Sequence, residues 1–217
     1  MAGEKRFLFE HIARYLGRKP APGEVSSVWS GQRPLVRQPS KSSTAAISRD
    51  HTILISSSGL VTVTGGKWTT YRRMGEDAVN RAAALVGLRE VRSRTADLKL
   101  HGWSIEGNGL DQWENSYGAD LPALREIMRD DPPLGDRLHS DLPFRKAEVI
   151  WAARFEMART VEDVLARRTR ALFLDARAAI AVAGETARLL AQELARDEAW
   201  QRRQEQDFRK LAEGYCL

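Results

Sequence analysis

The chain has little cysteine and no long apolar run. Its 217 residues include one cysteine, Cys216, which excludes a disulfide framework and any zinc or iron–sulfur centre bound by cysteines. No run approaches the ~18 apolar residues that a membrane-spanning helix needs, and residues 1–6 lead into no apolar core of a secretory signal. We therefore expect a protein of the reducing cytoplasm without a metal site.

The chain also lacks a G-x-G-x-x-G loop and the acidic residue that follows such a loop. This loop holds the pyrophosphate of a dinucleotide on the N-terminus of a helix. The remaining composition, 42% hydrophobic and 29% charged, is that of an ordinary globular protein and not of a disordered one. We expect a folded chain that cannot hold a dinucleotide cofactor alone.

The net charge of +5 is unevenly distributed. Residues 1–73 hold twelve Lys or Arg against four Asp or Glu, whereas the other 144 residues hold 22 basic against 25 acidic side chains. The basic residues are spread singly, without the basic cluster and interleaved aromatic residues of a nucleic-acid-binding face. This distribution predicts no nucleic-acid partner and favours a site for a small phosphate ester. Screened surface charge without a ligand is the alternative.

Hydrophobic periodicity divides the chain into a mixed part and a helical part. An amphipathic helix is predicted over residues 4–16 and another from Gly66 to Leu85, with Gly87 as its left-handed cap. Strand patterns cover 25–29, 33–37, 48–55 and 60–64. After residue 110 the strand patterns cease, and helices are predicted at 111–117, 120–129, 145–158, 161–171, 174–195 and 197–213. Whether residues 174–195 form one helix or two helices divided near Gly184 is left open, because glycine weakens a helix interior.

The most informative segment is the turn between the strand at 60–64 and the following helix. Gly65 and Gly66 let a backbone without side chains approach a ligand closely, and the helix N-terminus directs its free N–H groups toward the same place. Lys67 adds a positive charge, and Thr69 and Thr70 add hydroxyl groups. This pattern predicts an anionic or electron-rich ligand, such as a phosphate or the oxygen-bearing edge of a flavin. A tight turn without a ligand is the simpler alternative.

Four separated blocks resemble the late part of the aerobic, FAD-dependent glycerol-3-phosphate dehydrogenases. These blocks are G-Q-R-P-L-V at 31–36, S-R-D-H at 48–51, G-G-K-W-T-T-Y-R at 65–72, and T-V-E-D-V-L-A-R-R-T-R at 160–170. They occur in the family's order and span most of the chain. In the last block Thr160 and Asp163 also predict a capping box at a helix start, and we expect Glu156 to form ion pairs with Arg167 or Arg168.

The resemblance implies roles for individual residues. In the family the arginines of the first two blocks and the lysine after the glycine pair contact the substrate, which implies substrate-binding Arg33, Arg49 and Lys67 here. Lys67 is also the implied catalytic residue, because its charge would stabilise the reacting oxygen or the reduced flavin. The implied cofactor-binding residues are Gly65, Gly66, Thr69 and Thr70. His51 is not assigned as the base, because the family also has tyrosine there.

The implied function is that of a C-terminal fragment of an FAD-linked enzyme. The complete enzyme would oxidise sn-glycerol 3-phosphate to dihydroxyacetone phosphate and pass electrons to quinone, whereas this chain alone is expected to be inactive and not to retain FAD. Oxygen as acceptor, peripheral contact with the inner face of the membrane and a homodimer are left open. The alternative is a stand-alone helical interaction module without catalytic activity.

The expected fold class is α+β. Residues 1–88 are predicted to be a remnant of the substrate- and FAD-binding domains, with few strands plus helices. Residues 89–109 are a predicted linker, and 110–217 a predicted all-α C-terminal domain.

Overall fold

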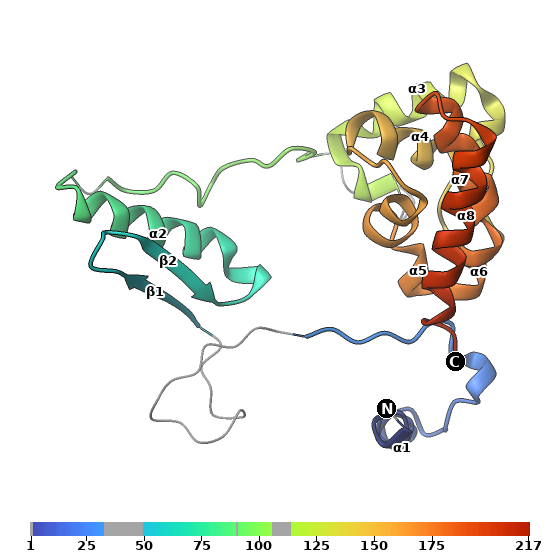
Figure 1. The fold of residues 1–217 in the computed structure, drawn as a ribbon, viewed down its shortest axis with the longest axis horizontal. Coiled ribbons are helices and arrows are strands. Elements are labelled where there is room, and N and C mark those ends of the chain that lie inside the picture. The colour runs from blue at the N-terminus through green and yellow to red at the C-terminus, as the bar shows by residue number, and fades with distance from the viewer. Residues whose placement is uncertain (1, 33–49, 90, 106–113) are drawn as a thin grey trace. The chain divides into compact units, whose positions relative to one another are not determined.

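The computed structural model describes residues 2–32, 50–89, 91–105 and 114–217. They form two compact units, which we call the helical unit (Met1–Ser30 with Gly102–Leu217) and the strand–helix unit (Gly31–His101). Figure 1 shows a mostly helical chain with a small antiparallel sheet, which confirms the expected α+β class. None of the helices in the described part of the chain has the length and apolar character that crossing a bilayer requires.

The strand–helix unit consists of a hairpin and one helix. The strands β1 (His51–Ile55) and β2 (Val61–Gly65) pair antiparallel with His51 opposite Gly65. Helix α2 (Tyr71–Leu85) lies along one face of this sheet (Figure 1). Gly87 has φ +71°, and the N–H of Leu88 donates to the Ala83 carbonyl at 2.9 Å, which confirms the predicted helix cap.

The helical unit is built around one main core. Small and branched residues at helical spacing bury against each other, and the largest fully buried side chains include Phe208, Leu142, Leu165, Leu172 and Leu190. The helices of this unit are α1 (Ala2–Leu16), α3 (Leu121–Asp130), α4 (Lys146–Phe155), α5 (Ala171–Leu174), α6 (Ala176–Ala181), α7 (Ala183–Glu193) and α8 (Glu198–Glu213), with a π-helical turn at Asp163–Arg168.

One helix start in the helical unit lies where the sequence predicted it, and one helix break does not. The Thr160–Asp163 capping box is confirmed: the Asp163 N–H donates to the Thr160 hydroxyl at 3.0 Å, and the Thr160 N–H donates to the Asp163 carboxylate at 3.1 Å. The helix predicted over 174–195 breaks, but at Asp175 and Val182 rather than at Gly184.

Glu156 is joined to Arg168, as expected, but through its backbone carbonyl and not through an ion pair of its carboxylate. The guanidinium of Arg168 donates to the backbone carbonyl of Glu156, from Nε at 2.9 Å. Arg167 instead pairs with Glu162 and Asp163, at 2.5 and 2.9 Å. Arg167 and Arg168 end a π-helical turn, Asp163–Arg168, and residue spacing alone does not indicate such a turn.

The segment 25–29 also differs from its expected form. It is extended but belongs to neither named strand, and it contacts the helical unit through hydrogen bonds such as that from the Ala176 N–H to the Ser26 carbonyl, at 2.9 Å. These contacts place residues up to Ser30 with the helical unit, whereas the sequence grouped them with 31–88. The predicted division into 1–88, 89–109 and 110–217 stays a prediction.

Candidate functional site

The candidate site is the turn that connects β2 to α2. The strand ends at Gly65 with φ +77°, and Gly66 follows with φ +81°. Both values lie in the left-handed region that glycine adopts without the steric cost of a Cβ atom. Lys67 returns to an extended conformation, and a 3-10 turn, Trp68–Thr70, leads into α2. The two successive left-handed residues thus turn the chain away from β2, and Lys67 follows them just before the N-terminus of α2.

Backbone and side-chain hydrogen bonds hold this turn closed. The Lys67 N–H donates to the Thr70 hydroxyl at 3.2 Å, and that hydroxyl donates to the Lys67 carbonyl at 3.0 Å. The side chain of Lys67 is exposed, and its ammonium pairs with no carboxylate among the residues that the structure describes. An unpaired charge at a helix N-terminus is suited to an anionic ligand. Thr70, however, is already used to close the turn.

Gly66 also packs closely against its surroundings. A Cβ atom built on Gly66 would lie 2.6 Å from Sδ of Met74 and 3.2 Å from Cβ of His51. The missing side chain therefore makes room for α2 and β1 to approach the turn. The need for glycine at this position has a structural reason in the described residues, besides any ligand.

A half-buried polar contact next to the turn was missed by the sequence reasoning. The Nε2 atom of His51, on β1, lies 3.0 Å from Oδ2 of Asp77, on α2. The Nε atom of Arg73 lies 3.2 Å from the other oxygen of Asp77. This chain of contacts joins the strand to the helix just below the glycine pair. The spacing of Arg73 and Asp77, four residues apart, indicated one half of it, but His51 joins only through the fold.

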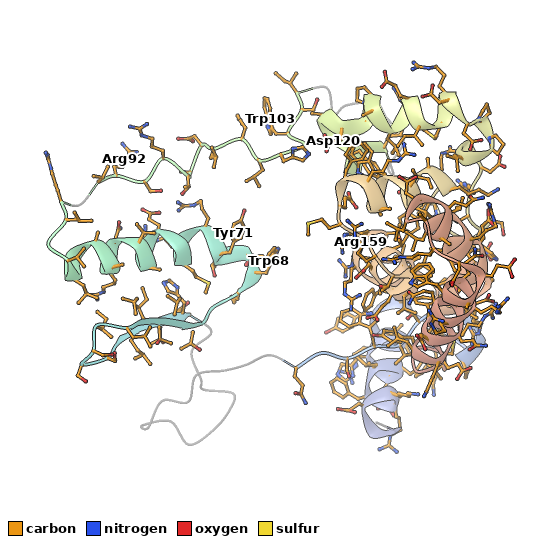
Figure 2. The ribbon with its side chains drawn as sticks, turned by 45° about the horizontal axis from the view of Figure 1, so that its top comes forward. Trp68, Tyr71, Arg92, Trp103, Asp120 and Arg159 are labelled. Carbon is orange, nitrogen blue, oxygen red and sulfur yellow. The ribbon has the colours of Figure 1, made fainter. Side chains whose placement is uncertain are left out.

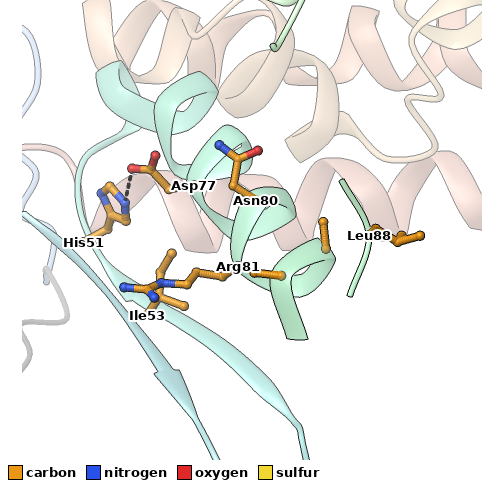
Figure 3. A pocket seen from close by; sticks show the side chains of 8 residues that line it. His51, Ile53, Asp77, Asn80, Arg81 and Leu88 are labelled. Atoms are coloured by element: carbon orange, nitrogen blue, oxygen red, sulfur yellow. Dashed lines mark hydrogen bonds and ion pairs between the residues drawn. The ribbon is translucent and has the colours of Figure 1, made fainter. Parts of the chain in front are cut away.

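This contact borders a cavity of about 440 Å³ between β1 and α2. Figure 3 shows His51 and Asp77 at one side of it, with Asn80 and Arg81 on the helix and Ile53 on the strand. Lys67 and the two glycines are not among its lining residues. The cavity is therefore lined by a different set of residues from the candidate site.

The structure brings together five of the predicted site residues and leaves two unplaced. Gly65, Gly66, Lys67, Thr69 and Thr70 occupy the single turn described above. Trp68 and Tyr71 lie at the start of α2 (Figure 2), and their ring centroids are 5.4 Å apart. Two further predicted residues, Arg33 and Arg49, lie outside the described residues. The roles assigned to all seven stay predictions.

A second electrostatic feature, a buried carboxylate with a perturbed pKa, lies in the helical unit. The carboxylate of Glu148 is buried, and it accepts hydrogen bonds from the Tyr117 hydroxyl at 2.7 Å and the Arg145 N–H at 2.6 Å. Burial raises the pKa of Glu148 despite these donors. Burial and the neighbouring Glu148 raise the pKa of Tyr117. This pair fastens the start of α4 to the segment before α3, and we read it as structural.

Comparisons with known proteins give a consistent match. A protein-family model described as the C-terminal domain of alpha-glycerophosphate oxidase matches residues 63–201. The probable mitochondrial glycerol-3-phosphate dehydrogenase of Caenorhabditis elegans is 37% identical over 220 residues, covering 91% of this chain. The mitochondrial glycerol-3-phosphate dehydrogenase of Homo sapiens is 35% identical over 226 residues, covering 94%. The chain spans only 30% and 31% of the lengths of these two relatives.

A solved structure supports the same fold. The glycerol-3-phosphate dehydrogenase from Bacillus halodurans, crystallised with FAD, is similar over 100% of this chain and 46% of its own, with a TM-score of 0.74 and 21% identity. At this identity the likeness concerns the fold alone.

Proposed function

The chain belongs to the family of the C-terminal domain of alpha-glycerophosphate oxidase, and from this membership we propose that it forms the C-terminal part of an FAD-linked glycerol-3-phosphate dehydrogenase. The complete enzyme oxidises sn-glycerol 3-phosphate to dihydroxyacetone phosphate and transfers electrons to quinone. The observation that carries the proposal is the turn between β2 and α2 within the matched residues. There the exposed Lys67, whose ammonium has no carboxylate partner in the part of the chain that the structure describes, lies at a helix N-terminus. The match spans both units, which favours this proposal over a helical interaction module.

The residues of the turn suit one side of a flavin. The flavin, when bound, supplies the acceptor for the two electrons removed from the substrate. The Lys67 ammonium is placed to attract the electron-rich edge of the ring or an anionic oxygen of the substrate. A positive group there stabilises the charge that develops in the reaction, and the closed turn fixes the backbone from which the Lys67 side chain extends. The pyrophosphate of the cofactor needs a loop that this chain does not contain.

The other assigned residues complete the proposal. Arg33 and Arg49 bind the phosphate or the hydroxyl groups of the substrate, because the planar guanidinium can donate to two oxygens at once. Thr69 contributes a further hydroxyl from the same turn as Lys67. We also propose a cytoplasmic location with peripheral membrane contact, which brings the enzyme close to quinone. The relatives reported above are named as mitochondrial.

The test is steady-state kinetics of the complete enzyme with glycerol 3-phosphate and an artificial electron acceptor. Lys67→Ala should lower kcat by about a hundredfold, the typical loss when a preorganised charge is removed from a reacting centre. Arg33→Ala should act mainly on KM, because it binds substrate in the ground and transition states alike. Lys210→Ala, an exposed lysine on α8, is the matched control and should change neither constant.

Three outcomes distinguish the assignments. Normal constants for both variants would show that neither residue lines the site. If Lys67→Ala only loses flavin, measured by the flavin content of the purified variant, the lysine anchors the cofactor and its catalytic role is wrong. If kcat falls while the flavin content stays normal, the proposed role is supported.

A further inference from the structure

The glycine pair makes the turn before Lys67 a hinge. Gly65 and Gly66 have φ +77° and +81°, and a glycine backbone moves between left- and right-handed conformations more easily than that of any other residue. The exposed side chain of Lys67 extends from the residue that follows this hinge. Unless other contacts restrain the hinge, the direction in which the Lys67 side chain leaves the backbone is poorly defined.

His51 contacts the hinge from the strand side. It lies directly opposite Gly65 in the antiparallel pairing of β1 and β2. Its Cβ atom lies 3.2 Å from the position of a Cβ built on Gly66, and the residue is half-buried. The first residue of β1 therefore lies against the hinge.

Asp77 contacts His51 from the helix side. Its Oδ2 atom lies 3.0 Å from Nε2 of His51, and Figure 3 shows this contact running from β1 to α2. Its other oxygen, Oδ1, lies 3.2 Å from Nε of Arg73, about one turn earlier on the same helix. Both oxygens of the carboxylate are thus used, one within the helix and one across to the strand.

The contact between His51 and Asp77 closes a loop around the hinge. The chain runs from Gly65 through the hinge and Lys67 into α2, and Asp77 on that helix returns to the residue opposite Gly65. Because the ends of this loop are joined, α2 cannot move about the glycines without breaking the contact. We propose that His51 and Asp77 are positioning residues, which hold the backbone of Lys67 in the place from which its ammonium acts. The inference rests on the proposed function, because the pair acts only through Lys67.

The physical reason is preorganisation. A charge stabilises a reacting centre most when it is already in place, because no free energy is then needed to move it there during the reaction. The Thr70 hydroxyl closes the turn on its helix side, but its bonds to Lys67 lie after the two glycines and do not restrain them. The contact of His51 with Asp77 does span the glycines. Its loss should therefore misplace Lys67 and lower kcat in a chain that remains folded.

The restraint can be tested on the 217-residue chain by NMR relaxation. The backbone order parameters of Gly66 and Lys67 should be near the value of about 0.85 that is typical of a rigid backbone, and Asp77→Ala should lower them below about 0.6. Glu76→Ala is the matched control and should leave them unchanged, because it removes the neighbouring carboxylate of α2 and ion pairs that lie within the helix. Low values in the unmodified chain, or no change in Asp77→Ala, would overturn the restraint.

The positioning role is tested by steady-state kinetics of the complete enzyme. Asp77→Ala and His51→Phe should each lower kcat at least severalfold and by up to about a hundredfold, the loss that a misplacement of about 1 Å can cause. KM and flavin content should stay near normal. His51→Phe keeps a ring beside Gly66 but cannot form the hydrogen bond, so it decides the matter if Asp77→Ala does not fold. A normal kcat in these variants would overturn the proposal.

Conservative variants separate the hydrogen bond from the charge of Asp77. Asp77→Asn keeps an oxygen that can accept from the imidazole but removes the negative charge, and His51→Gln keeps a side-chain N–H that can donate to Asp77. Both should retain most of the kcat that Asp77→Ala loses, and Glu76→Ala should leave kcat unchanged. If Asp77→Asn loses as much kcat as Asp77→Ala, the charge acts and not the contact, and the positioning role is overturned.

A double variant separates this inference from the proposed function. If the pair acts through Lys67, Asp77→Ala should lower kcat little further in a protein that already carries Lys67→Ala. Full additivity of the two effects, or a normal kcat for Asp77→Ala beside a lowered kcat for Lys67→Ala, would overturn the positioning role alone. A normal kcat for Lys67→Ala would instead refute the catalytic assignment on which the inference rests.

Discussion

Replacing Gly66 by alanine should destabilise the turn that carries Lys67 for two separable reasons. The residue has φ +81°, a conformation that costs an L-residue about 1–2 kcal/mol. The added Cβ would also lie 3.2 Å from Cβ of His51 and 2.6 Å from Sδ of Met74. The sulfur atom ends a flexible side chain and can move aside, whereas the Cβ of His51 is held by the strand. The overcrowding should cost a further ~1–3 kcal/mol.

Gly59 provides the matched control for the backbone term. It has φ +85°, and no atom lies within 4 Å of the position of its Cβ. Gly59→Ala should therefore destabilise the hairpin only by the conformational cost of about 1–2 kcal/mol. The difference between the two variants isolates the packing around Gly66. Adding Met74→Ala to Gly66→Ala should recover part of the loss, because the two positions are in contact.

The measurement is NMR-detected hydrogen exchange of the amides that join β1 and β2. Exchange reports the opening free energy of this hairpin separately from the helical unit, which a single denaturation midpoint would not do. Equal losses for Gly66→Ala and Gly59→Ala would refute the packing argument. An unchanged opening free energy for Gly66→Ala would refute both parts and leave ligand approach as the reason for the glycine.

Three further predictions concern electrostatics and the cofactor. The pKa of Glu148 is raised in the folded state. The free energy of unfolding should therefore fall as pH rises from the unfolded pKa of about 4.3 through the folded pKa. Glu148→Gln should remove this pH dependence in urea unfolding followed by circular dichroism, and an unchanged dependence would contradict the burial argument. Burial alone would raise the pKa of Asp163, but donors from Arg159, Thr160 and Arg167 lower it, so its contribution should be present above about pH 3.9 and be lost on further acidification. Asp163→Ala should then cost about 1 kcal/mol at neutral pH, as for other helix caps, and a stability equal to that of the unmodified chain would show that the cap adds nothing. Finally, the 217-residue chain mixed with FAD and desalted should show no visible flavin absorption, and a stoichiometric band would refute the argument from the absent pyrophosphate loop.

Local sequence patterns correctly predicted those turns and helix ends that depend on the conformation of one or two residues. The hairpin followed from two short β-branched runs around Ser56–Gly59. The strand β2 is shifted by one residue from the predicted 60–64, and residues 48 and 49 of the other predicted strand lie outside the described residues. The end of α2 followed from Gly87, and the helix start near residue 160 from the Thr160–Asp163 pair. The hydrogen bonds that close the hairpin turn and the two helix caps join residues fewer than six positions apart, so the spacing alone contains the information.

Contacts between distant segments were beyond such patterns. Residues 25–29 have the apolar spacing of an extended chain, and they are extended. Their partners, however, are groups at helix ends 145 or more residues further along. The pairing of His51 with Asp77 depends on how α2 lies across β1. The partners of Arg167 and Arg168 depend on a π-helical turn that residue spacing does not indicate.

The sequence alone determined the α+β class, the family resemblance, and a lysine on a glycine turn at a helix start. These features depend on short-range sterics and on the order of motifs, both of which a linear chain carries. The tertiary structure decided which groups share one neighbourhood. It showed that Gly66 is also needed for packing against Met74 and His51, and that Thr70 closes the turn. It also showed that the segment before Arg33 is docked on the helices, because hydrogen bonding and burial select partners by distance in space and not by distance along the chain.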